Sequence, residues 1–386
     1  MSLAMPAESA TTPGFSKLFA PGRFGPLQVR NRIVMAPMTR QLSPGGMPHE
    51  GVARYYRRRA EADVGLIITE GCWIDHPGAS NDPGVPRFYG DALDGWRKVL
   101  AEVHAAGAKI IPQLWHIGLY TTAAVAGFEK VNDQLRPDQV GPSGYSGTIG
   151  VAPTLRGKPM TDSDIADVIQ AYAKSAEASL ALGFDGIALH AAHGYLIDQF
   201  FWAETNRRDD RYGGSIAART TFAAEIVREI RRRTAPDFPI MLRFSQWKLQ
   251  NYAAKLVQTP DELMQFLAPL VDAGVDIFDC SQRRFWEPEF AGSELNLAGW
   301  TRKLSGKPTM TVGSVGLDGE LIASFSGEAS HPASLEKLFA RLERDEFDLV
   351  GVGRALLADA EWARKVRAGL IHTAKPYSAA ALAELV

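Results

Sequence analysis

A short apolar run with an acidic residue at or near its start recurs along the chain, and this repeat limits the possible folds more than any other feature. Clear copies are GFDGIAL at 183–189, GVDIF at 274–278 and EFDLV at 346–350. Continuous apolar runs of this length are typical of strands that are covered on both faces, as in parallel sheets. The glycine before a run suits the C-terminal cap of a preceding helix. The pattern therefore predicts repeated β-strand and α-helix units.

Eight such strands are predicted, with helical segments between them and a less regular connection near 295–304. Eight βα units favour a single closed (β/α)8 barrel, a TIM barrel of the α/β class. The alternative is an open doubly wound sheet, which would normally carry a glycine-rich first turn; the first turn here is PMTR at 37–40. The predicted strands are 32–38, 65–69, 109–114, 186–190, 240–244, 276–280, 309–312 and 348–352.

The domain organisation follows from this repeat. We expect residues 1–16 to be a disordered tail or a cloning remnant, and residues 17–386 to form one barrel domain. The segment 117–160 follows the third strand and is longer than a plain connection needs. We expect it to fold over the mouth of the barrel as a lid-like insertion.

Charge and cysteine content exclude several classes of protein. Lys plus Arg number 42 and Asp plus Glu number 44, which is not the charge balance of a nucleic-acid-binding protein. No apolar stretch reaches the ~20 residues of a membrane span. Two distant cysteines, Cys72 and Cys280, suit a reduced cytoplasmic protein and are too few for an iron–sulfur cluster. We expect a small-molecule substrate and no nucleic-acid or membrane partner; monomer and homo-oligomer both stay open.

Small and basic residues follow the last two predicted strands. Gly313 and Ser314 come after the seventh, and Gly353 and Arg354 after the eighth. TIM barrels commonly bind phosphate at these strand ends, where glycine lets backbone N–H groups approach the anion. A guanidinium binds phosphate bidentately. Glycines that only close tight turns are the alternative, but two such pairs favour a phosphate site.

The fourth strand ends in a histidine-rich motif, HAAHGY at 190–195. A third ligand at zinc spacing is not evident beside His190 and His193, so we expect no metal. Two imidazoles at one strand end favour two donors that converge on a ligand oxygen. Tyr195 is protonated at neutral pH and could serve as an acid. The alternative is that its ring only packs against its neighbours. Arg243 ends an apolar strand, where it either forms a structural ion pair or meets an anionic ligand group.

These residues resemble the old yellow enzyme family of FMN-dependent NAD(P)H oxidoreductases. The resemblance rests on MAPMTR at 35–40, QLWH at 113–116, NRRDDRYGGS at 206–215 and GVGR at 351–354, together with the histidine motif. It implies that His190 and His193 bind the substrate's carbonyl oxygen and that Tyr195 donates a proton. The residues implied to hold non-covalent FMN are Pro37, Met38, Thr39, Gly71, Gln113, His190, Arg243, Gly313, Ser314, Gly353 and Arg354.

The resemblance also implies an activity. NADH or NADPH would give hydride to flavin N5, and the reduced flavin would pass it to an electron-poor alkene in a ping-pong reaction. Alternatives are an NAD(P)H:flavin or quinone reductase with incidental ene-reductase activity, a non-redox barrel lyase or isomerase that binds phosphate, and a non-catalytic flavin-binding relative. The segments 245–257 and 281–290 depart from the family pattern and leave the substrate open.

Overall fold

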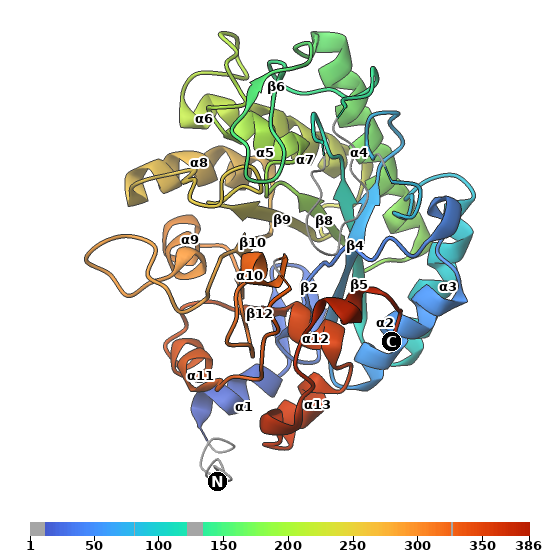
Figure 1. Ribbon diagram of the computed structural model, residues 1–386, viewed down its shortest axis with the longest axis vertical. Helices are drawn as coiled ribbons and strands as arrows, with labels where there is room; N and C mark the ends of the chain where they lie inside the picture. The colour runs from blue at the N-terminus through green and yellow to red at the C-terminus, as the bar shows by residue number, and fades with distance from the viewer. Residues whose placement is uncertain (1–11, 81, 122–133, 326) are drawn as a thin grey trace.

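Eight parallel strands close into a barrel at the centre of the molecule, and helices surround them (Figure 1). The computed structural model describes residues 12–80, 82–121, 134–325 and 327–386. The strands follow one another around the barrel in the order of the chain. The predicted TIM barrel is therefore confirmed. Its strands are β3 (Ile33–Met35), β4 (Leu66–Trp73), β5 (Lys109–Trp115), β8 (Ile187–His190), β9 (Ile240–Ser245), β10 (Ile277–Ser281), β11 (Thr309–Val312) and β12 (Leu349–Val352).

The helices between the strands begin and end at capping residues. The Thr259 hydroxyl accepts a hydrogen bond from the Glu262 amide, and Gly274 ends the same helix with a φ of 108°. The connection near 295–304 is more regular than expected, because Asn296 and Gly306 cap a helix there. The main helices are α2 (Glu50–Glu61), α3 (Ala92–Ala105), α4 (Asp162–Leu182), α5 (Leu196–Phe201), α6 (Ile216–Arg219), α7 (Thr221–Arg233), α8 (Pro260–Ala273), α9 (Leu297–Ser305), α10 (Leu321–Phe325), α11 (Glu336–Glu343), α12 (Arg354–Ala358) and α13 (Trp362–Arg367).

The acidic residues of the sequence repeat tie neighbouring strands together. Asp185, just before β8, accepts a hydrogen bond from the first apolar amide of β5, at Ile110 (2.9 Å). Asp276, before β10, accepts one from Ile240 N at the start of β9 (2.9 Å). Asp348, before β12, does the same for Thr309 N at the start of β11 (3.0 Å). Each carboxylate therefore satisfies a strand-end amide and fixes the register of two strands.

A hairpin that the sequence analysis did not predict covers one end of the barrel. Its strands, β1 (Gly22–Phe24) and β2 (Leu27–Val29), pair antiparallel. Phe24, Leu27 and Val29 pack in one buried cluster with the apolar residues inside the barrel. The barrel interior is thus a packed core, and the open end with the C-terminal strand tips is left for a site.

The folded part of the chain begins before the expected boundary at residue 17. Residues 1–11 lie outside the described residues, but Pro13–Phe19 form helix α1. Leu18 is fully buried, and the Phe15 ring meets Phe339 of α11 edge to face at 5.7 Å. The expectation of a disordered tail through residue 16 is therefore wrong for 13–16, because this helix packs against α11.

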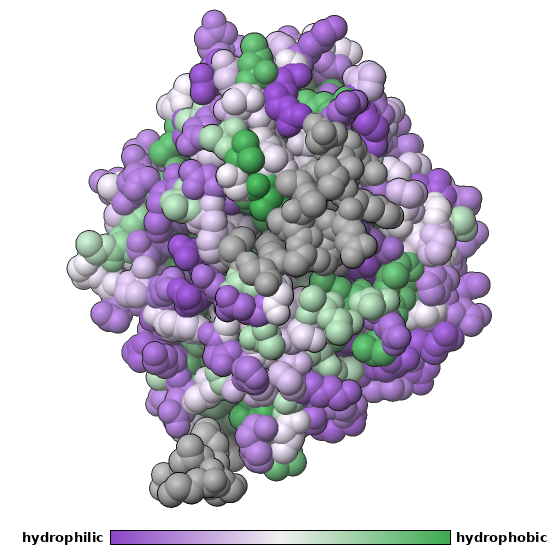
Figure 2. Space-filling model, viewed as in Figure 1, coloured by the Kyte–Doolittle hydropathy of each residue, from purple (hydrophilic) through white to green (hydrophobic). Residues whose placement is uncertain are grey.

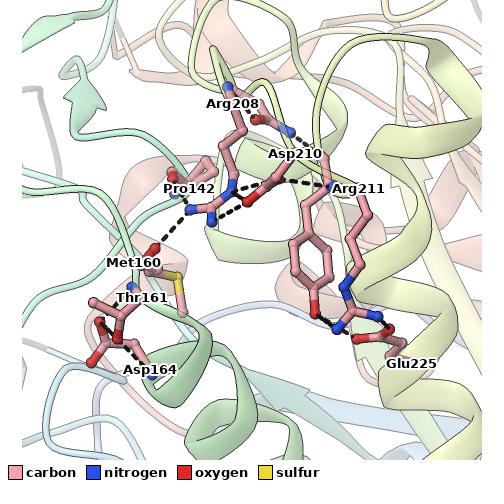
Figure 3. A network of polar contacts seen from close by, with 10 residues as sticks. Pro142, Met160, Thr161, Asp164, Arg208, Asp210, Arg211 and Glu225 are labelled. Atoms are coloured by element: carbon pink, nitrogen blue, oxygen red, sulfur yellow. Dashed lines mark hydrogen bonds and ion pairs between the residues drawn. The ribbon is translucent and has the colours of Figure 1, made fainter.

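The insertion after β5 is fastened to the barrel by the arginine-rich motif at 206–215. Its described part includes a small hairpin of β6 (Tyr145–Ser146) and β7 (Thr154–Leu155); residues 122–133 of the expected lid lie outside the described residues. Arg208 donates to the carbonyls of Pro142 and Met160, each at 2.7 Å, and pairs with Asp210 (Figure 3). This motif therefore has a structural role.

In the described part of the chain, no helix is long and apolar enough to cross a bilayer. On the face seen in Figure 2, hydrophobic residues form small separate groups among hydrophilic ones. Nor do the described residues bring three or more His, Cys, Asp or Glu side chains together as a metal site.

Candidate active site

A cavity of about 300 Å³ lies at the C-terminal ends of the barrel strands. It gathers nearly all of the site residues that the sequence predicts, from loops that are far apart in the chain. The structure leaves one of them, Gly71, outside the cavity lining. The predicted residues that line the cavity are Pro37, Met38, Thr39, Gln113, His190, His193, Tyr195, Arg243, Gly313, Ser314, Gly353 and Arg354.

Gly71 lies in the wall of the barrel instead. The second strand runs on to Trp73, so Gly71 lies within β4 and pairs in register with Gln113 of β5. A Cβ atom at Gly71 would lie 3.2 Å from the Trp115 ring, tighter than nearly all real Cβ contacts. Glycine at this position therefore makes room for Trp115, which itself lines the cavity.

His190, His193 and Tyr195 form one cluster of rings above the strand ends. The His190 ring meets those of His193 and Tyr195 edge to face, at 5.1 and 4.9 Å. Burial lowers the pKa of both imidazoles well below the usual value, and the nearby Arg243 guanidinium lowers it further. Burial also raises the pKa of Tyr195. At neutral pH the cluster thus holds two neutral imidazoles and a protonated phenol.

A serine that the sequence analysis did not select links this cluster to Arg243. The Ser281 hydroxyl lies 3.2 Å from Arg243 Nη2 and 2.8 Å from His193 Nε2. Arginine only donates hydrogen bonds, so the hydroxyl accepts from Arg243 and its own proton is free for His193. This arrangement favours the His193 tautomer that carries its proton on Nδ1.

Arg243 also faces a buried carboxylate. Its Nε lies 3.6 Å from Asp279 Oδ2, and both side chains are almost fully buried. Burial raises the pKa of Asp279 to about 6, although Arg243 opposes this shift. Neither carboxylate oxygen of Asp279, nor Arg243 Nε, has a hydrogen-bond partner among the described residues. The Arg243 guanidinium therefore keeps one N–H donor, on Nε, for which the described residues offer no hydrogen-bond acceptor.

The end of the cavity near Gly313, Ser314 and Arg354 has the features of an anion-binding site. Gly313 has a φ of 144° and Ser314 a φ of 49°, and a Cβ at Gly313 would lie 2.7 Å from the Gln282 carbonyl oxygen. Successive amides in such conformations form concave anion sites. Arg354 Nη1 lies 2.5 and 3.2 Å from the hydroxyls of Ser324 and Ser330. Burial lowers the pKa of Arg354.

A buried carboxylate and a buried ion pair hold the loops of the site in place. Glu70 of β4 accepts hydrogen bonds from the amides of Arg40 and Gln41, at 2.8 and 3.2 Å, which fixes the loop that carries Thr39. Burial raises the pKa of Glu70 to about 7. Lys248 and Asp198, both fully buried, pair at 2.6 Å. This ion pair joins the loop after β9 to helix α5, directly beside the histidine cluster.

The sequence and the coordinates were compared with known proteins. Residues 17–373 match the NADH:flavin oxidoreductase / NADH oxidase family. The chain belongs to this family. A morphinone reductase in complex with tetrahydroNAD superposes with a TM-score of 0.71 at 26% identity, covering 92% of this chain and 91% of that one. An old yellow enzyme homologue from Zymomonas mobilis gives 0.69 at 25% identity, covering 90% and 92%.

The curated relatives of this chain include longer proteins. An NADH oxidase of Thermoanaerobacter brockii is 34% identical over 369 residues, which are 92% of this chain and 51% of that protein. The chain spans about half the length of the first curated relatives it matches. The expected membership of the flavin oxidoreductase family that includes the old yellow enzymes is confirmed.

The residues of the cavity fit a flavin mononucleotide. Gln113 Nε2 and Arg243 Nε are buried without hydrogen-bond partners, as expected where a planar ring with polar edges would complete them. At the other end, the Gly313–Ser314 turn and Arg354 offer the donors that a phosphate needs. Sequence reasoning missed Ser324 and Ser330, because a serine is common and only the fold shows which ones converge.

Proposed function

We propose that this oxidoreductase holds FMN non-covalently and uses NADH or NADPH to reduce the C=C bond of electron-poor alkenes, such as α,β-unsaturated carbonyl or nitro compounds. One observation carries the proposal: two neutral imidazoles and a protonated tyrosine meet in one cavity, beside the residues that fit the flavin. The name of the structural neighbour morphinone reductase, in complex with a nicotinamide analogue, supports it.

The side chains of this chain would act on the substrate as follows. His190 and His193 donate hydrogen bonds to the substrate's carbonyl or nitro oxygen, and these strengthen as negative charge develops there. Tyr195 gives its proton to the α-carbon and regains one from solvent. The chemistry that FMN supplies when bound is hydride transfer from NAD(P)H to the β-carbon. One hydride and one proton thus saturate the double bond, and the dinucleotide is oxidised.

The test of this proposal separates the two half-reactions. The purified protein should show flavin absorbance that bleaches with NADH under anaerobic conditions and returns when cyclohexenone is added. Tyr195→Phe should bleach at the normal rate but lose about 100-fold or more of its rate of reoxidation by the enone, because only the second step needs the proton. Tyr172→Phe is the control, since Tyr172 is a fully buried tyrosine of α4 outside the cavity lining.

A second candidate is supported by the name of a relative. The Thermoanaerobacter brockii protein is called an NADH oxidase, which favours an enzyme that mainly reduces oxygen, quinones or free flavin. Rates with cyclohexenone and with added FMN or a quinone, compared at equal NADH, distinguish the two. A protein that stays colourless after reconstitution with FMN would contradict both.

A further inference from the structure

The two segments that depart from the family pattern build one wall of the cavity. Trp247 stacks on His193 with ring centroids 4.3 Å apart and planes at 23°. Tyr252 meets Trp247 edge to face at 5.1 Å, and the Arg283 guanidinium lies 4.4 Å from the Tyr252 ring centroid. These side chains all line the cavity. They form a continuous strip that runs from the histidine cluster to a cation.

Arg283 is the arginine of this cavity that has no role in the site described above. Arg243 faces Ser281 and Asp279, and Arg354 lies among serine hydroxyls at the anion end. Arg283, in contrast, is 40% exposed, and its Nε is buried without a hydrogen-bond partner among the described residues.

Arg283 has one acidic partner among the described residues, and the contact is long. Glu320 lies 3.5 Å from Arg283 Nη2 and is shared with Arg284, at 3.4 Å. Arg284 takes a closer partner in Glu287, at 2.8 Å. Asp82 is the one carboxylate side chain among the described residues that line the cavity. It follows β4, whereas Arg283 follows β10, which lies on the opposite side of the barrel. The ion pair of Arg283 with Glu320 is thus long, and Arg283 Nε remains a donor that an anionic group of a ligand would satisfy.

We propose that the substrate is a planar, conjugated compound that carries a carboxylate or a similar anionic group. Its flat body would lie along Trp247 and Tyr252, its acid would bind Arg283, and its alkene would reach the histidine cluster. This proposal rests on the proposed ene-reductase function. It assigns the specificity of that function to the segments 245–257 and 281–290.

A matched pair of substrates tests the charge preference. Cinnamaldehyde and 4-carboxycinnamaldehyde share the same planar enal and differ only in the anionic group. We expect the holoenzyme to reduce the carboxylated compound with a kcat/KM about tenfold higher, mainly through a lower KM, since one charge-assisted hydrogen bond is worth about that factor.

Variants of the arginine cluster then locate the preference. Arg283→Gln should remove the tenfold preference, by lowering kcat/KM for the carboxylated aldehyde about tenfold more than for cinnamaldehyde, and should not raise the KM for NADH or NADPH. Arg283→Lys should restore part of it. Arg284→Gln is the control, because Arg284 shares Glu320 but does not line the cavity; it should keep the preference.

Several results would overturn the assignment of Arg283. Equal kcat/KM for the two aldehydes in the wild-type holoenzyme would do so, with the ene-reductase function intact. So would an Arg283→Gln protein in which the KM for NADPH rises, which would assign Arg283 to the reductant, or in which FMN is lost, which would assign it to the cofactor. If neither aldehyde is reduced by a flavin-loaded protein, the ene-reductase function itself fails.

Discussion

At the scale of single residues, the hydroxyl of Ser281 connects the two chemically important groups of the site. It lies within hydrogen-bond distance of Arg243 on one side and of His193 on the other. In the proposed complex, the Arg243 guanidinium beside the flavin would thus orient, through Ser281, the imidazole that binds the substrate. The tautomer of a histidine is set by the hydrogen bond of its other nitrogen. Ser281 is therefore a positioning residue.

Removal of this hydroxyl should weaken substrate polarisation. We expect Ser281→Ala to lower kcat/KM for an enone about tenfold, because His193 then loses the partner that fixes its tautomer. Reduction of the flavin by NADH should change little. Ser281→Thr keeps the hydroxyl and should recover most of the activity. Nitrogen-15 NMR of the histidine rings checks the tautomer directly, and an unchanged ratio of the two tautomers in Ser281→Ala would contradict this role.

The sequence predicts which residues reach the site better than it predicts how they are held. Gln113, His190 and Arg243 could be selected because each is polar and ends or interrupts an apolar strand, and a barrel brings strand ends together. Lys248 and Asp198 could not be selected. Their pairing depends on a helix and a loop whose paired residues are 50 positions apart in the chain and meet only in the folded barrel.

At the scale of secondary-structure elements, the repeated acidic residue explains why the strand pattern could be read from the sequence. The same carboxylate marks the start of one strand and satisfies the first amide of its neighbour, as Asp276 does for Ile240. The hairpin of β1 and β2 was missed because its strands have three residues each, too short for an alternating pattern to show.

Loss of one of these carboxylates should destabilise the barrel without changing its chemistry. We expect Asp276→Ala to lower the free energy of unfolding by about 1–3 kcal/mol, since it leaves the Ile240 amide without its side-chain acceptor and removes the ionic partner of Arg231. The measurement is urea unfolding, with steady-state kinetics well below the transition. Asp272→Ala, an exposed position on α8, should change stability by less than about 0.5 kcal/mol. Equal stability of both variants would show that the carboxylates do not lock the strands.

At the scale of the whole molecule, distant parts of the chain close the cavity together. Tyr377 and Leu382, near the C-terminal end, line it opposite residues of the first strand loop. Arg40 holds that segment by donating to the carbonyls of Ala381 and Glu384. The family motifs do not predict this contact. Arg40 follows the first barrel strand, where a site residue is expected, but its side chain donates to backbone carbonyls of the C-terminal segment. Such contacts join segments from opposite ends of the chain, and local sequence patterns do not predict them.

The buried charges of the site also shape the stability of the whole molecule as a function of pH. The folded state raises the pKa of Asp279 from 3.8 to about 6, so between about pH 4 and pH 6 it binds more protons than the unfolded chain. Stability therefore falls as the pH rises through this window, by about 3 kcal/mol for this group alone. The opposite holds for Asp185: burial would raise its pKa, but hydrogen bonds from His104, Lys109 and the Ile110 amide lower it overall.

These opposite shifts predict opposite effects of two similar substitutions. Asp279→Asn cannot ionise, so it should raise the melting temperature relative to wild type above pH 7 and give no gain at pH 4. Asp185→Asn should lower it above pH 7, where the wild-type carboxylate is ionised and paired, and have less effect at low pH. Calorimetric melting of the three proteins from pH 4 to pH 8 checks both signs. A parallel pH profile for Asp279→Asn and wild type would mean that Asp279 stays ionised beside Arg243 throughout, and that this arginine is neutralised before any flavin binds.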